Sequence, residues 1–170
     1  MTSAVIVAAG SSRRMGFDKL SVELAGMPVL IRSVLAFQNC EAIDHIVVVT
    51  SRERLPEVER QRGELNLSKW HQVVEGDAER HLSVHRGLLA VPEGAGLVAV
   101  HDGARPLVTP GAISRCVAAA RSSMASVSRE RPCCARPISL WCDSTRSTSS
   151  ARPTASASAI AASIDRKSVV

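Results

Sequence analysis

Three cations near the start of the chain are the residues with the most evident chemistry. Two serines follow Gly10, and Arg13, Arg14 and Lys19 come after them. Small residues in a turn expose consecutive backbone N–H groups, and such a concave nest of donors binds anions, phosphate in particular. Arginine adds a planar fork of donors for phosphate oxygens, and lysine adds a mobile point charge. The segment therefore predicts a loop that binds a nucleoside triphosphate and stabilises negative charge while the phosphate chain is cleaved.

The spacing of the glycines excludes two common nucleotide-binding loops. No Gly-Lys-Ser or Gly-Lys-Thr completes a P-loop here, and the segment does not match the Gly-x-Gly-x-x-Gly fingerprint of dinucleotide binding. From these residues alone, an ordinary turn between a strand and a helix, with charges on its surface, stays open as the alternative.

Strand-like and helical segments alternate along the first 121 residues. Short apolar runs predict the strands, and apolar residues at helical spacing predict the helices between them. The predicted strands span residues 4–8, 43–50, 72–75 and 97–100, and the predicted helices span residues 28–38, 52–62, 80–91 and 110–121. We expect Ser51 to cap the second helix and Gly63 to end it.

This order predicts an α/β fold with a Rossmann-like, mostly parallel sheet, right-handed crossovers and helices on both faces. In such sheets, ligands bind beyond the C-terminal ends of the strands. The loop at Gly10, the turn at residues 75–77 and the corner at His101 and Asp102 each follow a predicted strand. We therefore expect all three to share one edge of the sheet and to line one pocket.

The composition restricts the class of protein. A chain of 170 residues, 45% of them apolar, is long enough for one domain with a sizeable core. Only 2% of the residues are aromatic, which argues against a platform that stacks single-stranded nucleic acid. No apolar run is long enough to cross a membrane, and the first residues lack the pattern of a secretory signal. We therefore expect a cytoplasmic protein whose partners include neither nucleic acid nor membrane, and whose five cysteines are reduced.

The character of the sequence changes near Ser122. Serine makes up 13 of the last 49 residues, helical periodicity is poor there, and no strand-like apolar run occurs. Two interpretations stay open: a natural disordered tail, or translation of a GC-rich gene out of its reading frame. We predict an incomplete folded domain over residues 1–121 and an aberrant C-terminal part, disordered or frameshifted, over residues 122–170.

Further motifs follow the opening loop at the spacing of a known family. They are Ala8-Ala9-Gly10 with Arg13 to Gly16 and Lys19, Gly26 with Pro28-Val29-Leu30, Gly76 with Arg80, Ser83-Val84 and Gly87-Leu88, and the run Val100-His101-Asp102-Gly103-Ala104-Arg105-Pro106. Over about residues 3–121, this pattern resembles the 2-C-methyl-D-erythritol 4-phosphate cytidylyltransferases. The opening motif occurs in many nucleotidyltransferases, whereas the run that begins at Val100 is far more specific.

The resemblance implies a fold of the nucleotide-diphospho-sugar transferase type and an enzyme of isoprenoid precursor synthesis by the non-mevalonate route. Such an enzyme transfers a cytidylyl group from CTP to 2-C-methyl-D-erythritol 4-phosphate, a sugar-alcohol phosphate, and releases pyrophosphate with Mg²⁺ as cofactor. The family forms a homodimer in which a protruding arm completes the partner's site.

The resemblance also implies roles for single residues. Arg14 and Lys19 would be catalytic, holding the triphosphate and stabilising the transition state. Asp102 would bind the metal. Nucleotide binding is implied for Ala8, Ala9, Gly10, Gly76, Asp77, Ser83, Gly103 and Arg105.

Some features of the family have no counterpart after Ser122, which leaves alternatives open. These features are a Thr-Asp-Thr segment, the arm of the homodimer, and the later Arg and Lys that position the substrate phosphate. The alternatives are a related cytidylyltransferase that uses ribitol 5-phosphate or a molybdenum cofactor as acceptor, and an inactive nucleotide-binding remnant.

Overall fold

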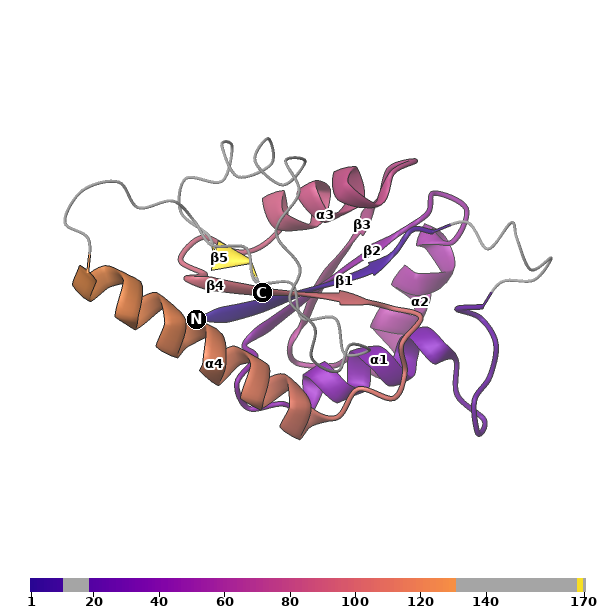
Figure 1. Ribbon diagram of the computed structural model, residues 1–170. Coiled ribbons are helices and arrows are strands. Elements are labelled where there is room, and N and C mark those ends of the chain that lie inside the picture. The colour runs from indigo at the N-terminus through magenta and orange to yellow at the C-terminus, as the bar shows by residue number, and fades with distance from the viewer. Residues whose placement is uncertain (11–18, 131–167, 170) are drawn as a thin grey trace, which may run out of the picture.

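A parallel sheet forms the centre of the molecule (Figure 1). The computed structural model describes residues 1–10, 19–130 and 168–169, and of residues 125–130 and 168–169 it describes the backbone alone. The strands in the described part are β1 (Thr2–Ala8), β2 (His45–Thr50), β3 (Trp70–Glu75), β4 (Leu97–Asp102) and β5 (Ser168–Val169). They lie in the order β3-β2-β1-β4-β5, and every neighbouring pair is parallel. The predicted parallel sheet is confirmed.

Helices cover both faces of this sheet, as predicted. The helices are α1 (Val29–Gln38), α2 (Leu55–Leu65), α3 (Arg80–Leu89) and α4 (Pro110–Glu130). One face packs against α1, α4 and Val58 of α2, and the other face packs against Leu88 of α3. In Figure 1, α3 accordingly lies on the opposite side of the strands from α1 and α4.

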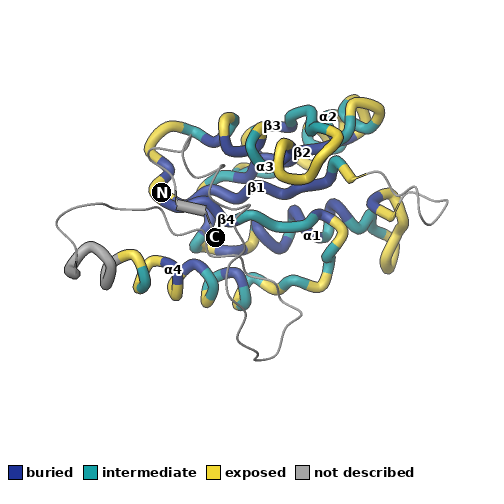
Figure 2. Tube along the Cα trace, turned by 45° about the horizontal axis from the view of Figure 1, so that its top comes forward, coloured by how far each residue is buried: buried dark blue, intermediate teal, exposed yellow. Residues whose placement is uncertain are grey.

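The residue alternation of β1 explains its central place. Ala4, Ile6 and Ala8 belong to the core beneath α1 and α4, whereas Val5 and Val7 belong to the core beneath α3. A strand with apolar side chains on both faces is stable only where helices cover both faces. In Figure 2, β1 is dark blue because all of its residues are buried.

The bounds of α2 differ from the prediction at both ends. The side chain of Ser51 caps nothing; its carbonyl instead accepts the N–H groups of Arg54 at 3.1 Å and Leu55 at 3.0 Å. The helix begins with a proline in its first turn, a position that proline favours. It then runs through Gly63 to Leu65, and its C-cap is Asn66, whose φ of 43° is left-handed. Asparagine tolerates this conformation, so Gly63 is not needed to end the helix.

Helix α4 also differs from the prediction, because it continues past Arg121 to Glu130. The segment from Ser122 to Glu130 contains neither glycine nor proline, and a helix tolerates all of its residues. Pro132 follows soon after, and the residue before a proline disfavours the helical conformation. The predicted domain boundary at Arg121 therefore falls inside a helix.

The rest of the C-terminal part is described only at its end. Ser168 and Val169 pair with Leu97 and Val98 of β4, although the sequence pattern predicts no strand in this region. Residues 131–167 lie outside the described part, so the disordered or frameshifted tail stays a prediction for them. Within the described part, no helix has both the length and the apolar content needed to cross a bilayer.

Candidate functional site

A cavity of about 520 Å³ lies at the C-terminal edge of the sheet. Three parts of the chain form its wall: the end of β1 with the residues after the loop, the start of α3 with the turn before it, and the corner after β4. The lining residues are Val7, Ala8, Ala9, Gly10, Lys19, Leu20, Asp77, Ala78, Arg80, Ser83, Asp102, Ala104 and Arg105. The expectation that these three loops line one pocket is confirmed.

Most of the predicted site residues line this cavity. They are Ala8, Ala9, Gly10, Lys19, Asp77, Ser83, Asp102 and Arg105. Gly76 and Gly103 adjoin lining residues, and Arg14 falls in the segment 11–18, outside the described residues. The geometry brings the described residues together, and their roles stay predictions.

Gly76 and Gly103 allow the walls of the cavity to approach one another. A Cβ atom on Gly76 would lie 2.4 Å from the Cβ of Ala9 and 2.9 Å from the Oγ of Ser83. A Cβ atom on Gly103 would lie 3.2 Å from the Cβ of Ala8. Any larger residue at Gly76 would thus push the turn after β3 away from β1.

The carboxylate of Asp102 lies between two arginines. Arg80 at the start of α3 donates to Oδ1 from Nη2 at 2.6 Å and from Nε at 3.1 Å. The Nε of Arg105 lies 3.3 Å from Oδ2. These ion pairs connect the helix on one side of the cavity to the corner on the other.

Arg80 is a charged residue of the cavity wall for which the sequence predicts no role. Its position after the turn at Gly76 is part of the motif quoted above, and that spacing is the signal available in the sequence. What the spacing does not reveal is that the guanidinium reaches across the cavity to Asp102. The contact depends on the distance between α3 and β4, which follows from the tertiary fold.

His101 stabilises the corner after β4, which contains Asp102 and Arg105. Its ring packs against Phe37 with 5.1 Å between the ring centroids, and Nε2 lies 3.2 Å from the carbonyl oxygen of Arg105. Burial disfavours the charged imidazolium, so the pKa of His101 lies below its ordinary value. The neutral ring then carries its proton on Nε2, because a carbonyl oxygen only accepts. This hydrogen bond fixes the backbone of the corner that contains Asp102.

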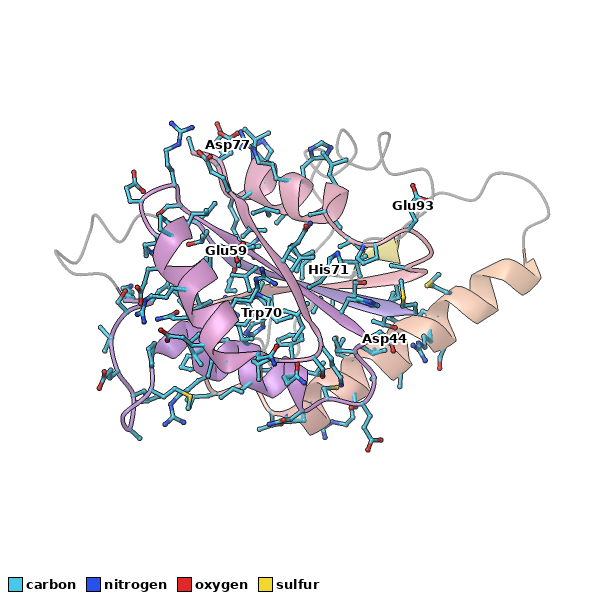
Figure 3. The ribbon with its side chains drawn as sticks, turned by 180° about the vertical axis from the view of Figure 1, so that it is seen from behind. Asp44, Glu59, Trp70, His71, Asp77 and Glu93 are labelled. Carbon is cyan, nitrogen blue, oxygen red and sulfur yellow. The ribbon has the colours of Figure 1, made fainter. Side chains whose placement is uncertain are left out.

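The turn after β3 is held by Ser83. The hydroxyl of Ser83 accepts the N–H of Asp77 at 2.9 Å and donates to the carbonyl of Asp77 at 3.1 Å. The carboxylate of Asp77 accepts the N–H of Ala78 at 2.7 Å through Oδ1 and the Nη2 of Arg86 at 2.7 Å through Oδ2. Both interactions favour the ionised form, the Ala78 amide more strongly, so the pKa of Asp77 lies below its ordinary value. Figure 3 shows Asp77 at the end of β3, next to α3.

The oxygen ligands near the cavity fit a divalent cation that takes most of its other ligands from water and a bound substrate. Among the described residues, no group of three or more His, Cys, Asp or Glu side chains could enclose a metal by itself. Asp102 offers one carboxylate, and Mg²⁺ commonly takes one or two such ligands together with water and substrate phosphates. A carboxylate has about four acceptor positions, so the bonds from Arg80 and Arg105 leave capacity for a cation.

The sequence is similar to those of one protein family. The family model described as 2-C-methyl-D-erythritol 4-phosphate cytidylyltransferase matches residues 2–132. A protein of that name from Caldanaerobacter subterraneus is 43% identical over 123 residues, which cover 69% of this chain and 53% of the relative. The chain thus spans about half the length of the curated relatives it matches.

Solved structures share the fold of this chain. The crystal structure of 4-diphosphocytidyl-2C-methyl-D-erythritol synthase from Anaerococcus prevotii matches with a TM-score of 0.62 and 29% identity, over 71% of this chain and 51% of that one. A CMP:2-keto-3-deoxy-manno-octonic acid synthetase complexed with CTP has a TM-score of 0.59 at 17% identity, over 73% of this chain and 48% of that one. The second likeness shows the shared fold alone.

Proposed function

Since the chain belongs to the 2-C-methyl-D-erythritol 4-phosphate cytidylyltransferase family, we propose that its cavity binds CTP for transfer of the cytidylyl group to 2-C-methyl-D-erythritol 4-phosphate. The observation that supports this most directly is the convergence of Lys19, Asp77 and Asp102 on one cavity. These residues come from three separate loops, and each has a type suited to one part of a magnesium nucleotide.

The reaction is a substitution at phosphorus. A phosphate oxygen of the acceptor attacks the α-phosphorus of CTP, the bond from that phosphorus to the bridging oxygen of the β-phosphate breaks, and pyrophosphate leaves. Negative charge develops on the bridging and equatorial oxygens. Catalysis of this kind is mostly positioning and electrostatic stabilisation, because the protein forms no covalent bond to the substrate.

We assign the phosphate end of the nucleotide to the first loop. Lys19, which lines the cavity beside Gly10, would stabilise the charge on the leaving pyrophosphate. Arg14 would act with it, in the segment outside the described residues. The small side chains of Ala8 and Ala9 let the nucleotide approach the backbone at the end of β1.

We assign the other two loops to the base and to the metal. Gly76, Asp77 and Ser83 would form the wall next to cytosine, with Gly103 and Arg105 near the ribose. Asp102 would hold Mg²⁺, which neutralises phosphate charge when bound. Arg80 and Arg105 would keep the carboxylate oriented, because both are ion-paired to it.

The acceptor side of the reaction is proposed from the family alone. Ribitol 5-phosphate and a molybdenum cofactor stay as alternative acceptors, and an inactive nucleotide-binding remnant stays as the alternative to an enzyme. The family match favours 2-C-methyl-D-erythritol 4-phosphate over the two other acceptors. The homodimer is a property of the family, and this chain has no counterpart of the arm after Ser122. A place in the cytoplasm stays a prediction.

Titration calorimetry of the 170-residue chain with CTP, with and without Mg²⁺, tests the nucleotide half of this proposal. We expect CTP to bind and Mg²⁺ to strengthen the binding. Absence of CTP binding under both conditions would overturn the proposed function.

Pyrophosphate release tests the other half. Release that depends on 2-C-methyl-D-erythritol 4-phosphate, and not on ribitol 5-phosphate, supports the proposed acceptor. CTP binding without release for any acceptor identifies the chain as a nucleotide-binding remnant.

A further inference from the structure

The turn between β3 and α3 is held in place by side chains of α3 that follow it in sequence. Ser83, one turn into the helix, bonds both backbone polar groups of Asp77. Arg86, one turn further, reaches back to the carboxylate of Asp77 with 2.7 Å between Nη2 and Oδ2. Two successive turns of α3 thus fix the same residue, one through its backbone and the other through its side chain.

Every polar atom of Asp77 has a partner within the protein. Its N–H and carbonyl bond Ser83, Oδ1 accepts the N–H of Ala78, and Oδ2 accepts Arg86. Each carboxylate oxygen of Asp77 keeps a further acceptor position, so the two bonds fix the side chain without excluding a ligand. The carboxylate orients the peptide unit of Ala78, which also lines the cavity.

Arg86 does not line the cavity. Its ion pair with Asp77 is partly exposed to solvent: 47% of the arginine side chain and 31% of the aspartate side chain are accessible. The turn it supports fits closely, because Gly76 has no space for a Cβ atom next to Ala9. A small rotation of the turn would therefore either cause a steric clash between Gly76 and Ala9 or move the turn away from the cavity.

We infer that Arg86 is a positioning residue, whose ion pair with Asp77 holds the turn at residues 76–78 in the orientation that contacts the base of the nucleotide. This inference rests on the proposed function for the identity of the ligand. Cytosine presents an exocyclic amine where uracil presents a carbonyl oxygen, so the orientation of a few peptide groups decides which base is accepted. Arg86 therefore affects the base end of the site and leaves the phosphate end unchanged.

The first test needs no nucleotide. Amide hydrogen exchange of the peptide that contains residues 76–79 is measured for the parent chain, Arg86→Ala and Arg86→Lys. Arg60→Ala is the matched control, because Arg60 is an exposed arginine ion-paired to Glu57 within α2, outside the cavity wall. We expect faster exchange in Arg86→Ala, substantial recovery in Arg86→Lys and no change in Arg60→Ala.

The second test compares three probes: CTP, UTP and inorganic tripolyphosphate. We expect Arg86→Ala to weaken CTP binding by about two- to fivefold, the range of a partly exposed ion pair, and to narrow the preference for CTP over UTP. Binding of tripolyphosphate stays unchanged, because it occupies only the phosphate end. Asp77→Asn, which keeps the shape of the side chain, reproduces the effect, and the double variant adds little to either single change.

The outcomes separate the two proposals. If Arg86→Ala and Asp77→Asn bind CTP and UTP as the parent does, or if tripolyphosphate binding falls together with CTP binding, the role of Arg86 is refuted while the proposed function stands. If the parent chain itself does not distinguish CTP from UTP, the proposed function fails and the role in base positioning fails with it. Circular dichroism identifies any variant that has lost its fold. If Arg86→Ala has lost it, Asp77→Asn decides in its place, because this change removes the charge and keeps the shape of the side chain.

Discussion

Lys19 is the described cation closest in sequence to the predicted phosphate loop, and it lines the cavity. Lys19→Ala removes a charge at the place assigned to the leaving pyrophosphate. We expect turnover of CTP to fall by about 10²- to 10³-fold, the usual effect of removing one donor to a developing charge. The thermal unfolding midpoint should change little, because Lys19 is exposed.

Steady-state kinetics and a melting curve measure the two effects, and Lys19→Arg is the control that keeps the charge. Equal turnover in Lys19→Ala would remove this residue from the mechanism.

The pKa of the Asp77 carboxyl group can be measured directly. The Ala78 amide and the Arg86 guanidinium hold its pKa below the ordinary value of about 3.9. A carboxyl group whose pKa is lower in the folded state stabilises that state above its unfolded pKa, and this contribution is lost as the pH falls through the folded pKa. We expect carbon-detected NMR to give a titration midpoint for Asp77 below that of an unfolded reference peptide. The midpoint should rise in Arg86→Ala, and an unchanged midpoint would show that the ion pair does not persist in solution.

The chemistry of single residues is predictable here wherever the residue type and its place after a strand decide it. The sequence predicts Lys19 and Asp102 at the cavity for that reason, and both line it. The contacts of Arg80 and Arg86 were not expected, because each depends on a long side chain that reaches a different element. Spacing along a helix gives the direction of such a side chain but not its partner.

At the scale of elements, helix α3 lies directly on the sheet because Gly87 has no side chain. A Cβ atom at this position would lie 2.4 Å from Cγ1 of Val5 and 2.8 Å from Cγ2 of Val49. Gly87→Ala should therefore destabilise the fold by about 1–3 kcal/mol through overpacking, as measured by urea unfolding. Gly63→Ala in α2 is the matched helical control, because nothing lies within 4 Å of its Cβ position. There we expect a gain of about 0.5–1 kcal/mol, and equal effects in the two variants would contradict the close packing of α3.

The buried face of α3 was only partly predictable from its apolar residues. Leu82 and Leu89 are 40% and 72% exposed, whereas Ser83 and Gly87 are buried. Close approach to the strands favours small residues, and the hydroxyl of Ser83 has both its partners in the turn before the helix. The bounds of α2 and α4 were missed for a related reason, since Asn66 and the glycine-free segment after Arg121 provide weaker signals than glycine or proline.

At the scale of the whole molecule, the alternation of strands and helices predicts the parallel sheet but not the order of its strands. The order β3-β2-β1-β4-β5 places β1 between β2 and β4, so the first loop of the chain emerges next to the corner after β4. The turn after β3 lies two strands away from β1 and reaches the cavity through α3. The convergence of the three loops thus follows from the position of β1 in the middle of the sheet.

The beginning of the chain is tied to the far end of the described domain through Thr2. Arg121 of α4 donates from Nη2 to Oγ1 of this fully buried threonine at 2.6 Å, across 119 residues of sequence. Asp44 also bonds Thr2, accepting its N–H at 2.7 Å through Oδ2 and donating its own N–H to the carbonyl of Thr2 at 2.8 Å. Through Thr2, the first residues of β1, the start of β2 and helix α4 form one connected unit.

Replacing Arg121 tests whether this unit is cooperative. Arg121→Met keeps an unbranched apolar stem in place of the arginine stem but leaves the buried hydroxyl of Thr2 without its donor, which should cost about 1–3 kcal/mol in urea unfolding. Arg115→Met is the control, because Arg115 is exposed on the same helix, and we expect a change within about 0.5 kcal/mol. If α4 unfolds together with the sheet, tryptophan fluorescence, to which the buried Trp70 contributes, and far-ultraviolet circular dichroism will give the same midpoint as each other within each variant. A separate, earlier loss of helical signal in Arg121→Met would instead show that α4 folds on the sheet as an independent element.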